Sequence, residues 1–177
     1  MGVSGSGKST TGAALARRLG VPFADADEFH PASNVAKMSA GVPLDDADRE
    51  PWLAAIAGWL ALHADGGVVI CSALKRAFRD RLRAAAPAAY FVHLSGDSAV
   101  VSARVAARTG HFMPVALVDS QFAALEPLEP DEHGLVLDLD QPVDAIVGAC
   151  LTAADRTAVG TAVVGTALAG TAEGTRT

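Results

Sequence analysis

The sequence is poor in cysteine and in basic residues. Its 177 residues include only two cysteines, Cys71 and Cys150, which lie far apart and in no metal-ligand spacing. This pattern favours two buried thiols in a reducing cytoplasm over a disulfide or a zinc site. Fourteen Lys and Arg stand against 20 Asp and Glu, for a net charge of −6. Such a balance argues against a nucleic-acid or anionic-membrane surface built on bulk charge.

Long apolar runs are also lacking. No stretch reaches the roughly 18 apolar residues of a membrane span, so none is predicted. No signal peptide is expected either, because residue 2 already belongs to a phosphate-binding motif. Half of the residues are apolar, enough for a buried core in one domain. We expect that domain over residues 1–155, followed by a disordered tail, rich in Gly, Ala and Thr, over residues 156–177.

Strand and helix patterns alternate along the chain. Helical patterns cover residues 8–19, about 48–63 (with Asp48 as N-cap), 76–86, 97–108, 115–125 and 143–151, and strand patterns cover 21–26, 68–71, 90–94 and 135–139. This alternation predicts an α/β fold with a parallel sheet and helices on both faces. A phosphate-binding loop normally follows a buried central strand, but only Met1 precedes it here. The sequence therefore predicts that the first strand is missing.

Residues 2–9 read GVSGSGKS and fit the phosphate-loop pattern G-x-x-x-x-G-K-[ST]. Glycines let the backbone curl so that its N–H groups point at phosphate oxygens, and the following helix adds its positive end. We expect Lys8 to reach the β- and γ-phosphates and the Ser9 hydroxyl to ligate Mg²⁺. A flexible Gly/Ser linker would not explain the Lys-Ser pair that opens an amphipathic helix. The predicted ATP-binding residues are Gly2, Val3, Ser4, Gly5, Ser6, Gly7, Lys8, Ser9 and Thr10.

A phosphate loop alone leaves kinases, GTPases and motor-type ATPases open. The chain is short for a large ATPase core, and the apolar run at residues 68–71 ends without the usual acidic magnesium ligand. Asp25 and Asp27 end a predicted strand at the sheet edge where open α/β folds bind ligands. We expect Asp27 to take the proton from an attacking hydroxyl and Asp25 to hold Mg²⁺ through water. The alternative is that both are ordinary turn residues.

Basic residues gather in the segments that follow the strands, at positions 37, 49, 75, 76 and 79. They suit an acceptor that carries a carboxylate, which the planar fork of Arg binds with two hydrogen bonds. Arg104 and Arg108 lie on one helix face and lead into TGHFMP at residues 109–114. This predicts a lid over about residues 108–117 that excludes water and adds positive charge. The alternative is a helix C-terminus with arginines that match its dipole.

Six stretches of the chain resemble the gluconokinases, a family of P-loop small-molecule kinases related in fold to shikimate and adenylate kinases. They are MGVSGSGKS at 1–9, DADEFHPASNVAKMSAGVPLDDADREPWL at 25–53, CSALKRAFRDRLR at 71–83, RTGHFMP at 108–114, SQFAALEPLEPDE at 120–132 and DLDQP at 138–142. Together they cover nearly all of residues 1–154. The run at 25–53 is far more specific than the phosphate loop, which many families share.

The resemblance implies that the chain phosphorylates D-gluconate with ATP and Mg²⁺ to give 6-phospho-D-gluconate. It implies a three-layer α/β fold with about five parallel strands, a lid, and a homodimer. It also implies site roles: Asp27 and His30 contact the acceptor hydroxyls, while Lys37, Arg49, Lys75, Arg79 and His111 are candidates for the acceptor pocket and its carboxylate. For the nucleotide, Arg104 would stack on adenine, Arg108 would serve the lid during transfer, and Gln141 and Pro142 would form the adenine loop.

Two alternatives remain open from the sequence. The first is a P-loop kinase for another small hydroxy acid such as shikimate, because the cationic residues fit many carboxylates. The second is an inactive nucleotide-binding fragment, because a missing central strand would expose two strand edges and part of the core.

Overall fold

The computed structural model describes residues 1–107, 115–156 and 163–164. Its helices are α1 (Lys8–Leu19), the 3₁₀ turn η1 (Ala26–Phe29), α2 (Ala32–Ser39), α3 (Asp46–Leu62), α4 (Arg76–Ala85), α5 (Ser98–Ala106), α6 (Val115–Ala124) and α7 (Val143–Arg156). Its strands are β1 (Phe23–Asp25), β2 (Val68–Ile70), β3 (Phe91–Ser95), β4 (Gly134–Asp138) and β5 (Val163–Val164). The predicted α/β architecture is confirmed.

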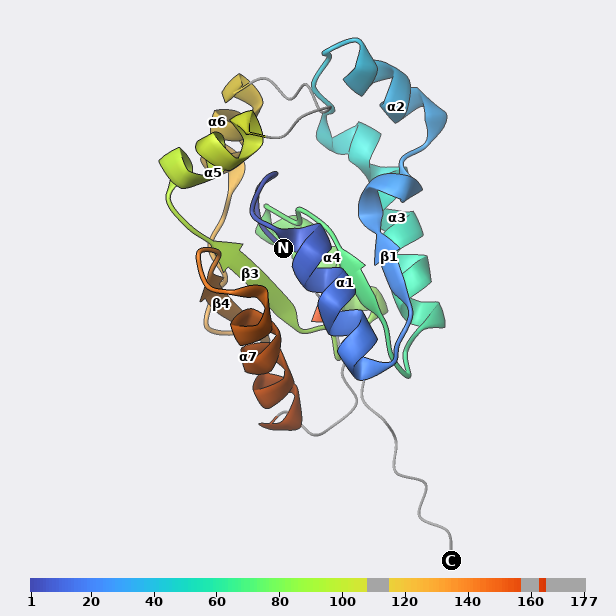
Figure 1. Cartoon of the computed structure of the whole chain (residues 1–177). Coiled ribbons are helices and arrows are strands. Elements are labelled where there is room, and N and C mark those ends of the chain that lie inside the picture. Colours follow the sequence, from blue (N-terminus) through green and yellow to red (C-terminus); the bar gives the residue numbers. More distant parts are fainter. Residues whose placement is uncertain (108–114, 157–162, 165–177) are drawn as a thin grey trace, which may run out of the picture.

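All strand pairs in the described residues are parallel. β2 pairs with β1 on one side and with β5 on the other, and β3 pairs with β4. The strands thus form two hydrogen-bonded sheets, β1-β2-β5 and β3-β4, and β5 contacts β3 where the two sheets meet. Helices α1 and α7 pack together in front of the strands in Figure 1, and α3 packs against α4. Every residue of β2 is buried, as its continuous apolar run predicts.

The predicted elements match the observed ones closely: β1 and β2 are shorter than predicted, and β3 and β4 are shifted by one residue. The start of α3 is a correction, because its N-cap is Asp45 and not Asp48. The Asp45 carboxylate accepts a hydrogen bond from the backbone N–H of Asp48 at 2.8 Å, and the Asp48 carboxylate accepts one from the N–H of Asp45 at 3.1 Å. This reciprocal capping box stabilises the helix one turn earlier than expected. The sequence reading also missed η1 and α2, which together carry part of the candidate site.

Two segments from opposite ends of the chain occupy the middle of the sheet. Met1 pairs with β3: its nitrogen donates to Val92 O, and its carbonyl accepts from Leu94 N at 3.0 Å. Val163 and Val164 stand in register with the first two residues of β2. The disordered tail stays a prediction: of residues 157–177 the structure describes only Val163 and Val164, which form β5. Pairing of this kind satisfies backbone groups that an open edge of a buried parallel strand would leave unpaired.

Both cysteines are buried free thiols, as predicted. Burial raises the pKa of the Cys71 thiol to about 12 and that of the Cys150 thiol to about 11, so neither forms a reactive thiolate near neutral pH. Among the helices of the described residues, none has the length and apolar character that crossing a membrane requires.

Removal of residues 157–177 is expected to lower the free energy of unfolding by about 1–3 kcal/mol. The truncated chain loses the hydrogen bonds of β5, each with a net contribution of about 1 kcal/mol. Urea unfolding followed by circular dichroism measures the change. The matched control lacks only residues 166–177 and retains β5, so it is expected to keep the stability of the full chain. Equal stability of the two shortened chains would contradict a structural role for β5.

Candidate active site

The phosphate loop curls between Met1 and α1 with glycines in left-handed conformations. Gly5 has φ 83° and Gly7, the N-cap of α1, has φ 92°. Side chains rarely adopt these angles, and a Cβ atom at Gly5 would also lie 2.5 Å from Val105 Cγ2 on α5. The Ser6 hydroxyl is buried and is the one such side-chain atom of the described residues without a hydrogen-bond partner. A buried hydroxyl of this kind suits a phosphate oxygen as its partner.

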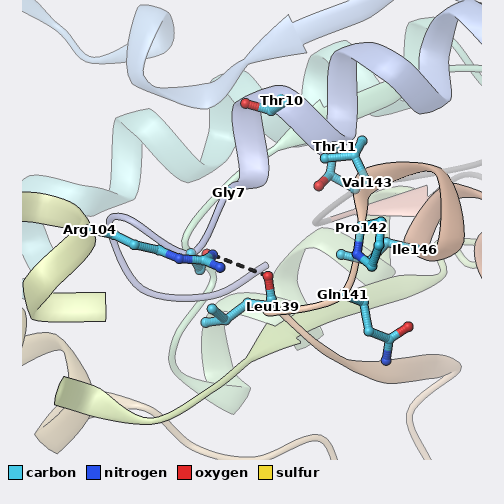
Figure 2. Close-up of a pocket in the computed structure, with 10 residues that line it drawn as sticks. Gly7, Thr10, Thr11, Arg104, Leu139, Gln141, Pro142, Val143 and Ile146 are labelled. Carbon is cyan, nitrogen blue, oxygen red and sulfur yellow. Dashed lines mark hydrogen bonds between the residues drawn. The ribbon is translucent and has the colours of Figure 1, made fainter. Parts of the chain in front are cut away.

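A pocket of about 290 Å³ opens beside this loop (Figure 2). Its wall combines the loop and the start of α1 with α5 and the segment that leads into α7: Ser6, Gly7, Thr10, Thr11, Arg104, Leu139, Gln141, Pro142, Val143 and Ile146. The structure thus brings the predicted nucleotide residues Arg104, Gln141 and Pro142 together with the phosphate loop. Arg104 donates to Leu139 O at 3.1 Å and to the Asp140 carboxylate at 2.7 Å, so it also fixes the 139–141 segment.

The two predicted aspartates lie at the end of β1. Asp25 is the last residue of the strand, and its carboxylate accepts a hydrogen bond from Asp27 N at 3.0 Å. Burial raises the pKa of the Asp25 carboxyl. A cation beside it would favour the ionised form, which suits its predicted role toward magnesium. Asp27 itself is exposed, as a group that meets a substrate hydroxyl must be.

His30 follows η1 and stacks on Trp52 of α3, with ring centroids 4.8 Å apart and planes 6° from parallel. Trp52 Nε1 donates to Ala26 O at 2.6 Å, which ties η1 to α3. His30 Nδ1 lies 3.4 Å from the Asn34 side-chain nitrogen. Burial lowers the pKa of His30, so the ring is neutral near pH 7 and acts as a hydrogen-bonding group.

Three of the predicted acceptor cations gather around the first turn of α3. Lys37 Nζ lies 2.5 Å from the Asp48 carboxylate, and Lys75 Nζ lies 2.9 Å from the Asp46 carboxylate. Arg49 also faces Asp46, at 3.5 Å. All three side chains are partly exposed, so a bound anion can exchange with their present carboxylate partners.

Arg79 is a correction to the predicted acceptor set. Its side chain is fully buried and forms a two-point ion pair with the equally buried Glu132, at 2.6 and 2.8 Å. Its remaining N–H groups donate to the carbonyls of Ala73, Leu74, Glu126 and Pro127. With every donor engaged inside the protein, Arg79 holds two loops together and does not bind the acceptor.

Arg108 and His111 lie outside the described residues, as does most of the predicted lid at 108–117, of which only the start of α6 is described. Sequence reasoning missed a further contact from that helix. The Gln121 side-chain oxygen accepts from Ser4 N at 2.6 Å, across 117 positions of sequence. The sequence did contain a signal for this contact. Gln121 lies in the stretch SQFAALEPLEPDE at 120–132, which carries part of the family resemblance but has no predicted site residue.

The parallel sheet, the glycine loop before α1 and the acidic end of β1 define a class: a P-loop kinase for a small-molecule acceptor. A family model described as shikimate kinase matches residues 4–141, which include most of the phosphate loop, both aspartates and the first residues after β4.

Within this class, the chain belongs to the gluconokinase family. It is 44% identical to the thermosensitive gluconokinase of Escherichia coli (strain K12), with 86% of this chain and 84% of that protein covered. It is 47% identical to the gluconokinase of Gluconobacter oxydans (strain 621H), with 83% and 84% covered. The crystal structure of a gluconokinase from Sinorhizobium meliloti 1021 superposes with a TM-score of 0.81 at 47% identity, over 89% of this chain and 90% of that one.

Replacement Arg79→Met is expected to lower the free energy of unfolding by about 3–5 kcal/mol, because it leaves the Glu132 carboxylate buried and unpaired. Urea denaturation measures the change. Arg81→Met on the same helix is the control, since Arg81 pairs with Glu50 at the surface and its loss is expected to change stability little. If the two variants were equally stable, Arg79 would not have the structural role assigned to it.

Proposed function

We propose that the protein transfers the γ-phosphoryl group of ATP to the terminal hydroxyl of D-gluconate, giving 6-phospho-D-gluconate and ADP. Membership of the gluconokinase family supports the acceptor. The chemistry is supported by an exposed carboxylate, Asp27, two residues after β1 in η1, and by a phosphate loop whose buried Ser6 hydroxyl lacks a partner among the described residues.

The nucleotide would occupy the pocket of Figure 2. The loop N–H groups and the N-terminus of α1 would bind the phosphates, with adenine toward Arg104, Gln141 and Pro142. Lys8 Nζ now donates to Val3 O at 2.8 Å and would exchange this carbonyl for phosphate oxygens. Ser9 and Asp25 would hold Mg²⁺, whose hard, oxygen-preferring character matches a hydroxyl and a carboxylate. Bound there, the ion would neutralise charge on the phosphates.

The acceptor would lie between β1, η1 and the first turn of α3. Asp27 would accept the proton of the attacking hydroxyl while the oxygen forms its bond to the γ-phosphorus and the bond to ADP breaks. The neutral ring of His30, fixed by its stack on Trp52, would orient the acceptor hydroxyls. Lys37, Arg49 and Lys75 would bind the carboxylate by exchanging partners with Asp46 and Asp48.

The proposal also covers the lid, the extent of the catalytic domain, the location of the protein and its oligomeric state. Arg108 and His111 would act from a lid at residues 108–117, adding charge and excluding water at transfer. Residues 1–155 would form the catalytic domain. We also propose that the protein is cytoplasmic and that it forms a homodimer. The homodimer is proposed on the family resemblance alone.

Gluconate-dependent ADP release is expected in a coupled assay with Mg-ATP. Other sugar acids, shikimate and nucleoside monophosphates form the comparison panel, and 6-phosphogluconate is detected independently with its dehydrogenase. Soluble, folded protein that phosphorylates shikimate or another acceptor but not gluconate would contradict the proposed substrate. Folded protein without turnover on any acceptor would point to a nucleotide-binding protein without kinase activity.

Replacement Asp27→Asn is expected to lower kcat by about 100-fold or more, because the amide cannot accept the hydroxyl proton. The dissociation constant of an ATP analogue, measured by calorimetry, is expected to change little. Glu28→Gln removes the neighbouring exposed carboxylate and serves as the matched control, with kcat close to that of the unaltered protein. Loss of ATP-analogue binding equal to the loss of kcat would place the Asp27 carboxylate at the metal instead.

A further inference from the structure

A single peptide group of the phosphate loop is held on both sides by side chains. The carbonyl of Val3 accepts from Lys8 Nζ at 2.8 Å, and the N–H of the next residue, Ser4, donates to Gln121 Oε1 at 2.6 Å. The C=O and N–H of a trans peptide point in opposite directions. Lys8 and Gln121 therefore clamp the Val3–Ser4 peptide from its two sides.

Gln121 belongs to a helix that is itself firmly anchored. α6 packs against α5, whose Val101 and Val105 lie beneath Gly5 of the loop. Just beyond α6, Glu126 N donates to Leu74 O at 2.9 Å, and Arg79 donates to the Glu126 carbonyl. These contacts hold α6, and with it the Gln121 side chain, at a fixed position relative to the phosphate loop.

Gly2 (φ 135°) and Gly5 (φ 83°) flank the Val3–Ser4 pair, and because glycines tolerate both signs of φ, the segment that carries this peptide can reorient. If the Val3–Ser4 peptide turned over, its carbonyl would no longer face the Lys8 ammonium. The bond from Ser4 N to Gln121 opposes that rotation.

We propose that Gln121 is a positioning residue that acts on Lys8 through the Val3–Ser4 peptide. By fixing the direction of this peptide, it keeps the Lys8 ammonium at the loop in the absence of nucleotide, so that less order has to be imposed when the triphosphate binds. The inference rests on the proposed kinase function, in which Lys8 meets the phosphates.

The test is a double-mutant cycle on the affinity for a non-hydrolysable ATP analogue. Gln121→Leu keeps the approximate size of the side chain and removes its acceptor, and we expect the dissociation constant to rise about tenfold, at the upper end of the effect of one neutral hydrogen bond. The KM for gluconate is expected to change little. In a Lys8→Ala background the same replacement is expected to cause no further loss, because the residue on which Gln121 acts is gone.

The control is Asp119→Asn, an exposed residue on the same helix, which is expected to bind the analogue and turn over gluconate as the unaltered protein does. An unchanged dissociation constant in Gln121→Leu, or an equal loss in both backgrounds, would overturn the proposal. If Gln121→Leu lowers the Tm, Gln121→Met takes its place in the cycle, because Met is unbranched like Gln. The same two results, an unchanged dissociation constant or an equal loss in both backgrounds, would then overturn the proposal.

Analogue binding needs no acceptor, so the cycle is independent of the substrate. Failure of the unaltered protein to phosphorylate gluconate would therefore count against the proposed function, and failure of the cycle would count against the role of Gln121.

Discussion

The curl of the phosphate loop is the feature on which the rest of the site depends, and bonds from the N–H groups of Gly2 and Ser4 to Ser72 and Gln121 help to fix it. Gly5 and Gly7 adopt left-handed angles that only glycine takes readily. Neighbours then fix the curl from outside: Gly2 N donates to Ser72 O beyond β2, and Val105 of α5 closes the space beside Gly5. The sheet and α5 are therefore as necessary to the loop as its own sequence.

The buried pair of Arg79 and Glu132 organises the opposite side of the site. Its guanidinium bonds the carbonyls of Ala73 and Leu74, at a turn where Ala73 has φ 41°, an angle unfavourable for a residue with a side chain. The same group bonds the carbonyls that follow α6. This one side chain thus joins the loop that carries Lys75 to the segment that follows α6, which explains why a cation lies in the protein interior.

Local signals in the sequence were sufficient for much of this architecture. The phosphate loop, α1 and the continuous apolar run of β2 follow from spacing within a few residues, and so does the position of Asp25 and Asp27. The role of Arg79 does not follow from local spacing, because its partner Glu132 lies 53 positions along the chain. Nothing in the sequence near Arg79 distinguishes a buried arginine from an exposed one. The sequence predicts Asp48 as the N-cap of α3, but the run DDAD at 45–48 offers several capping side chains, and only the backbone shows that Asp45 is the one that caps.

The place of β5 has a consequence for how the protein is made. A ribosome synthesises β2 and β3 long before it reaches Val163 and Val164, which lie between them in the finished sheet. During that interval the nascent chain exposes two strand edges directly behind the phosphate loop, the kind of surface that chaperones cover and that promotes misassembly. The pairing of β2 on this side is thus completed late in translation, when Val163 and Val164 emerge.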